Sequence, residues 1–492
     1  MTLIATAESI ASGEQTAVEV TEAALTRIAS AEPHLNAMIH VDEDGARTQA
    51  AQIDAARSEG QPLGALAGVP LTVKDLIAVA GLPLTAGSNM LGDYVPARDA
   101  TVVQRLREAG AIILGKTSLD EFAMGSTNES AATGLVRNPW DLTRVPGGSS
   151  GGSAAAVSAA YGLGSLGTDT GGSVRLPAAL CGLVGLKPSY GRVSRSGVVA
   201  YASSLDQVGP MAATVRDAAR LLSVIAGDCD EDATSRAVPV GAYEAACERP
   251  VAGLRVGVVR DWLEGLSSDC CEAVESALAH LQARGAITVE VTLPHAHLAV
   301  PTYYLIAMSE ASANLARYDG VRFGHRADLA TGDSLDDLYA RSRSEGFGDE
   351  VKRRIVMGTW ALSSGYYDAY YDRACRVRRL IHNDLQRALG SSDVILGPTA
   401  PSAAWPLGSH QHDPVAAYQM DIYTTVANLA GLPAVSVPMG LGSQGLPLSV
   451  QLMAAAFDET TLLRAAAGVE ADAPALPTSP TGLAHALSGG AA

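Results

Sequence analysis

The chain has 492 residues, with 52 acidic and 35 basic side chains and a net charge of −17. Its composition, 47% hydrophobic and 18% charged, is that of a soluble globular protein with a large core. The acidic surface repels phosphate, so we expect no direct binding of nucleic acid. No basic residue precedes Arg27, and the uncharged stretch 422–457 is interrupted by prolines and glycines. We therefore expect neither a secretory signal nor a membrane span.

The six cysteines show no Cys-x-x-Cys spacing and are too few for a disulfide scaffold. Reduced thiols of this kind are typical of a cytoplasmic protein. The sequence therefore predicts a cytoplasmic location.

The first sixty residues favour amphipathic helices. Thr16 and Glu19 form a capping box, and Leu25 and Ile28 lie at helical spacing behind it. We predict a helical segment over residues 1–65 that packs on the core.

From residue 66 to 468, short β-prone runs alternate with Ala-rich helical stretches. Residues 70–73, 111–114 and 183–186 are predicted strands, and 102–109 and 154–160 are predicted helices. This alternation predicts an α/β fold with a sheet covered by helices on both faces.

The last residues, 469–492, contain three prolines and end in Gly-Gly-Ala-Ala. Such composition at a chain end is typical of a segment with few packed contacts. We predict a frayed C-terminal tail.

Two glycine-rich patterns match functional motifs, but the neighbouring sequence does not predict the strands and loops that these motifs require. Residues 110–117 match a phosphate-binding loop, but the interior Ala-Ile-Ile-Leu is a strand and a helix precedes it. Residues 147–151 match the nucleophile elbow of α/β-hydrolases, but a turn-rich loop leads into them where a strand is required. We expect neither nucleotide binding nor a serine–histidine–aspartate site here.

A third signal combines two serine-bearing glycine loops with one lysine. The loops are GGSSGGS (147–153) and GTDTGGSVR (167–175), and Lys74 lies upstream in GVPLTVKD. Two serines and a lysine can build an acyl-transfer site without histidine. Gly171 and Gly172 let the backbone approach a substrate, so that N–H groups can face a developing oxyanion.

These loops and three further segments resemble the amidase signature family. The segments are KPSYGRVSRSGVVAYASSLDQVGP (187–210), YYLIAMSEASANLARYDGVRFG (303–324) and SEGFGDEVKRRIVMGTWALSSGYYDAYY (344–371). Within that family they are most similar to the A subunits of glutamine-dependent aspartyl/glutamyl-tRNA amidotransferases, over nearly the whole chain. The resemblance implies one large domain with a mixed, twisted sheet.

By this resemblance Ser173 is the nucleophile, Ser149 is a relay serine that follows a cis peptide bond, and Lys74 is the base. A lysine can accept a proton only when it is neutral, which requires burial or nearby positive charge to lower its pKa. Arginine could not replace it, because a guanidinium stays protonated in proteins. Only four of the 35 basic residues are lysines.

The resemblance also assigns the oxyanion hole and the substrate contacts. The oxyanion hole is expected from the backbone N–H groups of Thr170, Gly171, Gly172 and Ser173. Glutamine needs a cation for its carboxylate and an acceptor for its ammonium group. These tasks are expected of Arg354 and Asp421, with Tyr303 nearby.

The implied function is the hydrolysis of glutamine, with ammonia passed on for amidation of Glu-tRNA(Gln) or Asp-tRNA(Asn). The implied partners are a tRNA-binding B subunit and a small C subunit. No cofactor is expected in this chain, and ATP and Mg are expected on the partner. Leu176 and Leu76 depart from the family pattern, so a stand-alone amidase or acyltransferase acting on another amide is the alternative.

Other polar features favour structural roles. The pairs His295–His297 and His410–His412 have no third ligand at a suitable spacing, so no metal site is expected. Arg175, two residues after the expected nucleophile, is predicted to form a structural ion pair.

Overall fold

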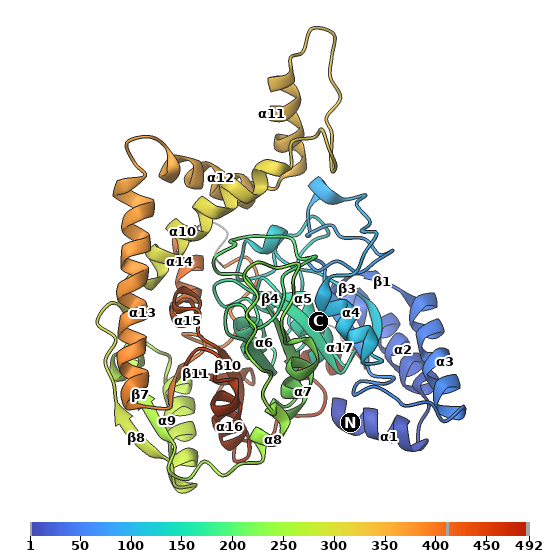
Figure 1. Ribbon diagram of the computed structural model, residues 1–492, viewed down its shortest axis with the longest axis vertical. Helices are drawn as coiled ribbons and strands as arrows, with labels where there is room; N and C mark the ends of the chain where they lie inside the picture. Colours follow the sequence, from blue (N-terminus) through green and yellow to red (C-terminus); the bar gives the residue numbers. More distant parts are fainter. Residues whose placement is uncertain (1, 410–412, 489–492) are drawn as a thin grey trace.

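An eleven-stranded sheet forms the centre of the computed structural model, which describes residues 2–409 and 413–488 (Figure 1). The strand order is β1-β3-β2-β4-β6-β5-β10-β11-β9-β7-β8. The strands are β1 (Met38–Val41), β2 (Pro70–Lys74), β3 (Ile112–Thr117), β4 (Gly164–Asp169), β5 (Val184–Lys187), β6 (Gln207–Ala212), β7 (Arg255–Val258), β8 (Ile287–Glu290), β9 (Val394–Pro398), β10 (Ala434–Leu441) and β11 (Pro447–Ala454).

The sheet is mixed. Strands β3, β2 and β4 run parallel to one another, as do β9, β7 and β8, and the other neighbours pair antiparallel. The helices are α1 (Leu3–Ser12), α2 (Ala17–Leu35), α3 (Glu43–Ser58), α4 (Thr101–Glu108), α5 (Gly151–Ser158), α6 (Arg175–Leu180), α7 (Val215–Ile225), α8 (Tyr243–Cys247), α9 (Ser268–Ala283), α10 (Ala299–Asn314), α11 (Leu335–Gly346), α12 (Asp349–Leu362), α13 (Arg373–Ser391), α14 (Pro414–Tyr418), α15 (Thr425–Ala430), α16 (Glu459–Glu470) and α17 (Thr481–Leu487).

Side chains alternate between two cores on opposite faces of the sheet. In β9, Val394 and Leu396 belong to the core beneath α4, α7, α9 and α16, whereas Ile395 belongs to the core beneath α10, α13 and α15. This two-residue period is expected of a strand that is buried on both faces. The mixed α/β sheet with helices on both sides confirms the predicted fold class.

The predicted elements around the two glycine motifs are confirmed. Residues 112–117 form β3, so the phosphate-loop pattern is a buried strand. The 147–151 segment is a loop that enters α5, and no strand lies between β3 and α5. Neither motif has the local structure that its function requires.

The two chain ends differ from their predictions. Residues 38–41 form β1, which pairs antiparallel with β3, so the N-terminal segment also contributes an edge strand. The expected frayed tail contains α17, whose Leu483 is buried and whose backbone is bonded to Pro139 and Trp140. The burial of Leu483 and the bonds to the 139–140 backbone hold this short helix, and such contacts are not visible in the sequence. Residues 489–492 of the predicted tail lie outside the described residues.

The expectations for cysteines and the membrane can also be compared with the structure. All six cysteines are free thiols. Over the described ranges, no helix combines the length and the hydropathy needed to cross a bilayer. The segment before α11 and α11 itself project from the body as an arm, residues 319–346 (Figure 1).

Candidate active site

Lys74 is the last residue of β2, and it is fully buried. Leu71 and Val73 belong to the core on one face, so the strand alternation turns Thr72 and Lys74 to the other face. The Lys74 Nζ lies 2.8 Å from the Oγ of Ser149, 2.9 Å from that of Ser150 and 2.9 Å from the Oγ1 of Thr168. Three hydroxyl groups therefore surround the amine.

These surroundings make Lys74 an unusual cation. Burial lowers its pKa to about 7, although the more distant carboxylates of Asp120, Asp169 and Asp206 act in the opposite direction. A hydroxyl can bond to either the ammonium or the neutral amine. A large fraction of Lys74 is thus able to accept a proton near neutral pH.

The first glycine loop turns sharply at Ser149. The Gly148–Ser149 peptide bond is cis, as the resemblance implies. A Cβ on Gly148 would lie 2.1 Å from the Oδ2 of Asp120, so only glycine fits there. The Asp120 N–H donates to the Ser149 carbonyl at 3.1 Å, which holds the loop against the Asp120 backbone.

The second glycine loop connects β4 to α6 and meets the first loop at Ser173. The Ser150 N–H donates to the Ser173 carbonyl at 3.2 Å. Ser173 is 8% exposed, whereas Ser149 and Ser150 are fully buried. Among the described residues, the Ser173 hydroxyl takes no hydrogen bond; such bonds often tighten only when substrate is present.

The backbone of this loop has the features of an oxyanion site. The N–H groups of residues 170–173 have no acceptor within the described part of the chain. A Cβ on Gly171 would lie 2.5 Å from the Tyr303 ring, and one on Gly172, where φ is +142°, would lie 2.3 Å from the Thr424 Oγ1. The two glycines therefore allow Tyr303 and Thr424 to pack directly against the loop.

Arg175 anchors the loop from behind. Its Nε and Nη2 each donate to the Asp169 carboxylate at 3.0 Å, and its Nη2 also donates to the Asn428 Oδ1. The side chains of Arg175, Asp169 and Asn428 are all buried. Although burial raises the pKa of Asp169, the guanidinium holds it at about 2. The predicted structural ion pair of Arg175 is confirmed.

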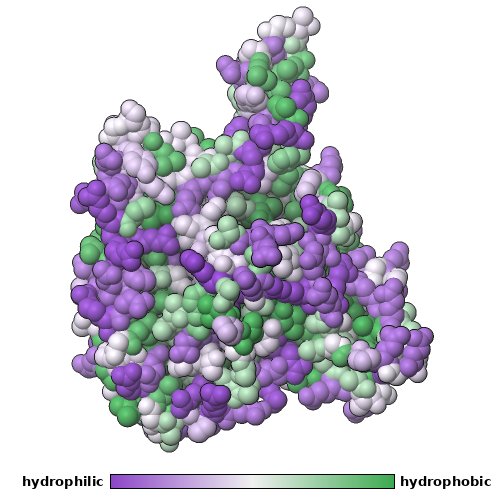
Figure 2. Space-filling view, viewed as in Figure 1, coloured by the Kyte–Doolittle hydropathy of each residue, from purple (hydrophilic) through white to green (hydrophobic). Residues whose placement is uncertain are grey.

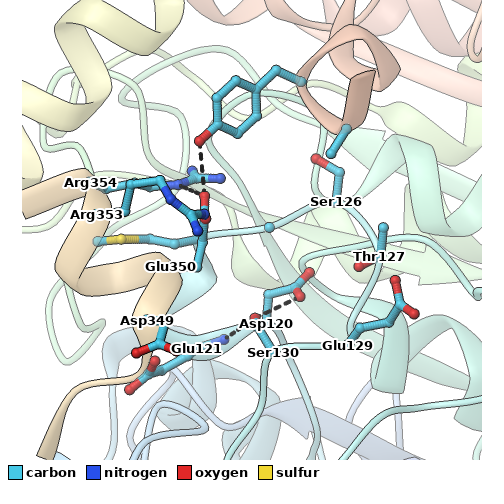
Figure 3. A pocket seen from close by; sticks show the side chains of 14 residues that line it. Asp120, Glu121, Ser126, Thr127, Glu129, Ser130, Asp349, Glu350, Arg353 and Arg354 are labelled. Carbon is cyan, nitrogen blue, oxygen red and sulfur yellow. Dashed lines mark hydrogen bonds and ion pairs between the residues drawn. The ribbon is translucent and has the colours of Figure 1, made fainter. Parts of the chain in front are cut away.

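A cavity of about 470 Å³ is lined by residues of the 120–130 segment, whose Asp120 bonds the Ser149 carbonyl, and by α12; its lining residues, all in the described part of the chain, include none from either glycine loop (Figure 3). Figure 3 shows α12 along one side, with Glu350 and Arg354, and the loop with Asp120 and Ser126 opposite. The charged lining residues are Asp120, Glu121, Glu129, Asp349, Glu350, Arg353 and Arg354. A cavity of this size with both signs of charge suits a small zwitterion.

Arg354 is 3% exposed and is fixed on both sides. Its Nε donates to Glu350 Oε1 at 2.8 Å, and its Nη1 donates to the Tyr201 hydroxyl at 2.8 Å. The guanidinium also lies over the rings of Tyr304 and Tyr418. Its Nη2 has no acceptor among the described residues, so this nitrogen can donate to a ligand.

Asp421 lies one hydrogen bond behind the cavity. Its Oδ2 accepts from the Ser126 Oγ at 3.0 Å and from the Tyr304 hydroxyl at 2.9 Å. Burial raises the pKa of Asp421 to about 6, although these two hydrogen bonds oppose the shift. Arg354 therefore lies in the cavity wall, whereas Asp421 lies behind Ser126, which lines the cavity.

Several contacts around these groups were absent from the sequence analysis. Ser150 and Thr168 lie in the two quoted motifs but received no role, although they touch Lys74. Glu350 is four residues before Arg354, a spacing that would have suggested an ion pair on one helix face. Ser126 gave no pattern, because only the fold brings it to Asp421.

The two departures from the family pattern are buried apolar residues. Leu176 packs with Trp140, Val145 and Leu180, and Leu76 packs in the core beneath α10. Both side chains therefore have a packing role, and neither is among the residues that line the cavity.

The histidine pairs offer no metal site within the described residues. His295 bonds to Asp384 at 2.9 Å, and no group of three metal-ligating side chains occurs there. His410 and His412 lie outside the described residues.

Comparisons with known proteins place this geometry in context. A family model described as Amidase matches residues 19–463. The A subunit of glutamyl-tRNA(Gln) amidotransferase from Myxococcus xanthus strain DK1622 is 54% identical over 471 residues, which cover 96% of each chain. The protein of the same name from Roseiflexus sp. strain RS-1 is 54% identical over 465 residues, 94% of each chain.

Two solved structures show the same architecture. The A subunit of glutamyl-tRNA(Gln) amidotransferase from Thermotoga maritima matches with a TM-score of 0.78 and 41% identity, over 93% of this chain and 92% of that one. Peptide amidase from Stenotrophomonas maltophilia matches with a TM-score of 0.82 and 33% identity, over 96% and 97%.

Proposed function

The chain belongs to the amidase family, and from this premise we propose that it is the glutamine-hydrolysing A subunit of a tRNA-dependent amidotransferase. One observation carries the proposal: a fully buried lysine faces the hydroxyl of Ser149, and that loop meets the loop of Ser173. A lysine neutralised by burial is the base that a serine nucleophile needs where no histidine is present.

The first half of the reaction forms a tetrahedral intermediate. Neutral Lys74 takes the proton of Ser149, which takes the proton of Ser173 as the Ser173 oxygen attacks the carboxamide carbon of glutamine. Negative charge then develops on the carbonyl oxygen. The unbonded N–H groups of residues 170–173 stabilise that charge, because they are held in place before the reaction begins.

The second half forms the Ser173 ester and then hydrolyses it, which returns the enzyme to its starting state. The proton passes from Lys74 through Ser149 to the leaving nitrogen, the C–N bond breaks, and ammonia departs from the Ser173 ester. Water then adds to the ester with the same residues taking and returning the proton, and glutamate is released. No group beyond these side chains and water is needed to balance either half.

Arg354, Asp421 and Tyr303 select the substrate in this proposal. The free Nη2 of Arg354 donates to the α-carboxylate, and Asp421 accepts from the α-ammonium group. Tyr303 lies against Gly171 and closes the space beside the reacting carbon. The neutral carboxamide then lies at Ser173.

Ammonia released in this chain would be used by a partner. The relatives at 54% identity are named as subunits, so we propose a tRNA-binding B subunit and a small C subunit. That partner would hold ATP and Mg and would amidate Glu-tRNA(Gln) or Asp-tRNA(Asn) in the cytoplasm. The net charge of −17 supports leaving contact with tRNA to another chain.

The surface supports the presence of a partner. Hydrophilic side chains cover much of the face in Figure 2, and the arm at the top shows apolar side chains among hydrophilic ones. The exposed apolar residues of the arm are Val321, Phe323, Leu329 and Leu335, and those of α12 are Val356, Met357 and Trp360. Exposed apolar groups of this kind are typical of protein–protein contacts.

A stand-alone amidase is less well supported. The peptide amidase is 33% identical, whereas the named subunits reach 54%. Arg354 at the cavity wall and Asp421 behind Ser126 also offer groups of opposite sign for a free amino acid, which a general amide does not require.

Ammonia release from glutamine tests the proposal. Wild-type protein should release ammonia, more quickly with the partner subunits and the misacylated tRNA, and Ser173→Ala should lose several powers of ten. Wild-type-like release by Ser173→Ala would refute the nucleophile. Activity that is confined to aryl or fatty amides would favour the stand-alone amidase.

A further inference from the structure

The buried carboxylate of Asp206 connects two parts of the site that are far apart in sequence. Asp206 is 6% exposed and directly precedes β6, whose first residue Gln207 pairs with Asp169 at the end of β4. This register places Asp206 beside Thr170, at the start of the oxyanion loop. The Thr170 hydroxyl donates to the Asp206 Oδ1 at 2.7 Å.

The same carboxylate holds the backbone beneath Arg354. The Tyr201 N–H donates to Asp206 Oδ2 at 3.0 Å, and the Ala202 N–H donates to Oδ1 at 3.1 Å. Tyr201 is 1% exposed, and its hydroxyl accepts from Arg354 at 2.8 Å. Hydrogen bonds at both ends of Tyr201, together with its own covalent frame, thus link Thr170 and Asp206 to Arg354.

We propose that Asp206 is a positioning residue that sets the oxyanion loop and the Arg354 clamp with a single carboxylate. The inference rests on the proposed function, because it takes Arg354 to hold the glutamine carboxylate. We call the bond from Asp206 to Thr170 the loop arm, and the connection from Asp206 through Tyr201 to Arg354 the clamp arm. Neither belongs to the projecting arm of residues 319–346. Asp206 contacts neither the substrate nor the reacting atoms, so it acts through these neighbours and, at a distance, through its charge at Lys74.

The carboxylate is chemically required at this place. Three donors converge on its two oxygens, and an ionised carboxylate can accept from all three. The Asp206→Asn variant replaces one of these oxygens by an NH2 group, which is a donor. In one orientation the NH2 group faces the Tyr201 N–H, and in the other it faces the Ala202 N–H and the Thr170 hydroxyl, so a donor meets a donor in both. Burial raises the pKa of Asp206 to about 6, so the group is ionised in an assay at pH 8.

The test compares two substrates. Glutamine uses both arms, whereas pentanamide has a carboxamide but no carboxylate for Arg354, so it reports on the loop arm alone. Steady-state ammonia release by the full chain at pH 8 would be measured for Thr170→Val, Tyr201→Phe and Asp206→Asn. Thermal unfolding of each variant would show whether it is folded at the assay temperature.

Each arm has its own expected result. Loss of one hydrogen bond to a charged group costs about tenfold. Tyr201→Phe should raise the KM for glutamine about tenfold with kcat and pentanamide turnover unchanged. Thr170→Val should lower kcat about tenfold on both substrates with little change in KM. Asp206→Asn should show both effects on glutamine and only the kcat loss on pentanamide.

Two results would overturn the inference. One is an Asp206→Asn variant that is folded and affects only one arm or neither. The other, which holds even if Asp206→Asn fails to fold, is a Tyr201→Phe variant that slows pentanamide or a Thr170→Val variant that raises only the KM for glutamine. Failure of the proposed function would look different, because wild-type protein would then release no ammonia from glutamine at all.

Discussion

Two fully buried lysines lie on neighbouring strands and have opposite surroundings. Lys116 in β3 pairs in register with Val73, the residue before Lys74 in β2. The Lys116 Nζ contacts Asp75 Oδ1 at 2.7 Å and the Pro83 carbonyl at 2.9 Å. Within the described residues, the hydrogen-bond partners of the Lys74 Nζ are all hydroxyl groups.

The comparison shows what turns a buried lysine into a base. Burial lowers the pKa of both groups, but the carboxylate of Asp75 opposes the shift at Lys116 and stabilises its ammonium form. The hydroxyls around Lys74 bond to the neutral amine equally well. We therefore expect Lys116 to serve the structure and Lys74 to serve proton transfer.

The largest expected effect separates the two lysines in catalysis. Lys74→Met removes the base and retains an apolar stem, so ammonia release should fall by about 10⁴-fold or more. Lys74→Arg should be equally inactive, because a guanidinium does not accept a proton at neutral pH. Circular dichroism and thermal unfolding would establish that both variants fold. Substantial turnover by Lys74→Arg would contradict the role of the lysine.

Removal of Lys116 should act on stability. Lys116→Ala leaves Asp75 buried without its cation, which should lower the free energy of unfolding by about 3–5 kcal/mol. Turnover per folded molecule should change far less than in Lys74→Met. Denaturant titration measures the first quantity, and the double variant Lys116→Met/Asp75→Asn should recover part of the loss. A fall in turnover equal to that of Lys74→Met would break the comparison.

The next effect lies in the cavity, where a cation must stay charged. Arg354→Lys keeps the charge but loses the planar guanidinium. In the wild-type protein that group bonds Glu350 and Tyr201 through Nε and Nη1 and leaves Nη2 for the ligand. The KM for glutamine should rise about tenfold while kcat changes little. An unchanged KM would argue against a clamp at this residue.

An effect of similar size to that of Arg354→Lys depends on pH. The pKa of Asp421 is raised to about 6, so the carboxyl becomes protonated and loses its charge as the pH falls through that value. Binding of glutamine to the Ser173→Ala variant should weaken about tenfold between pH 7 and pH 5. Calorimetry measures the affinity without turnover. Asp421→Asn is the matched control, and it should bind weakly with little dependence on pH over this range.

The sequence predicted the architecture, and it named most of the residues that the structure brings together at the candidate site. The strands around Lys74 and the loops of Ser149 and Ser173 follow from local patterns and from the resemblance to a family. Their hydroxyl neighbours could not be assigned in advance, because Thr168 reaches Lys74 only after β2 and β4 pair. The same applies to Asp206, whose partners come from separate segments.

The chain ends show the same limit on a smaller scale. Edge strand β1 has four residues, too few to display a period, and α17 depends on the burial of Leu483. Local sequence does not record which groove such a short element will find.

The pKa of Lys74 tests the account most directly, and the small number of lysines makes it measurable. With only four lysines in the chain, protein labelled with ¹³C-lysine should give four side-chain signals. Burial lowers the pKa of Lys187 to about 7 as well, so the spectrum of Lys74→Arg is needed to assign the Lys74 signal.

We predict that the Lys74 signal titrates near pH 7 and that kcat/KM for glutamine rises with pH through the same midpoint. A Lys74 signal that titrates near pH 10, while kcat/KM still rises near pH 7, would contradict the assignment of Lys74 as the base.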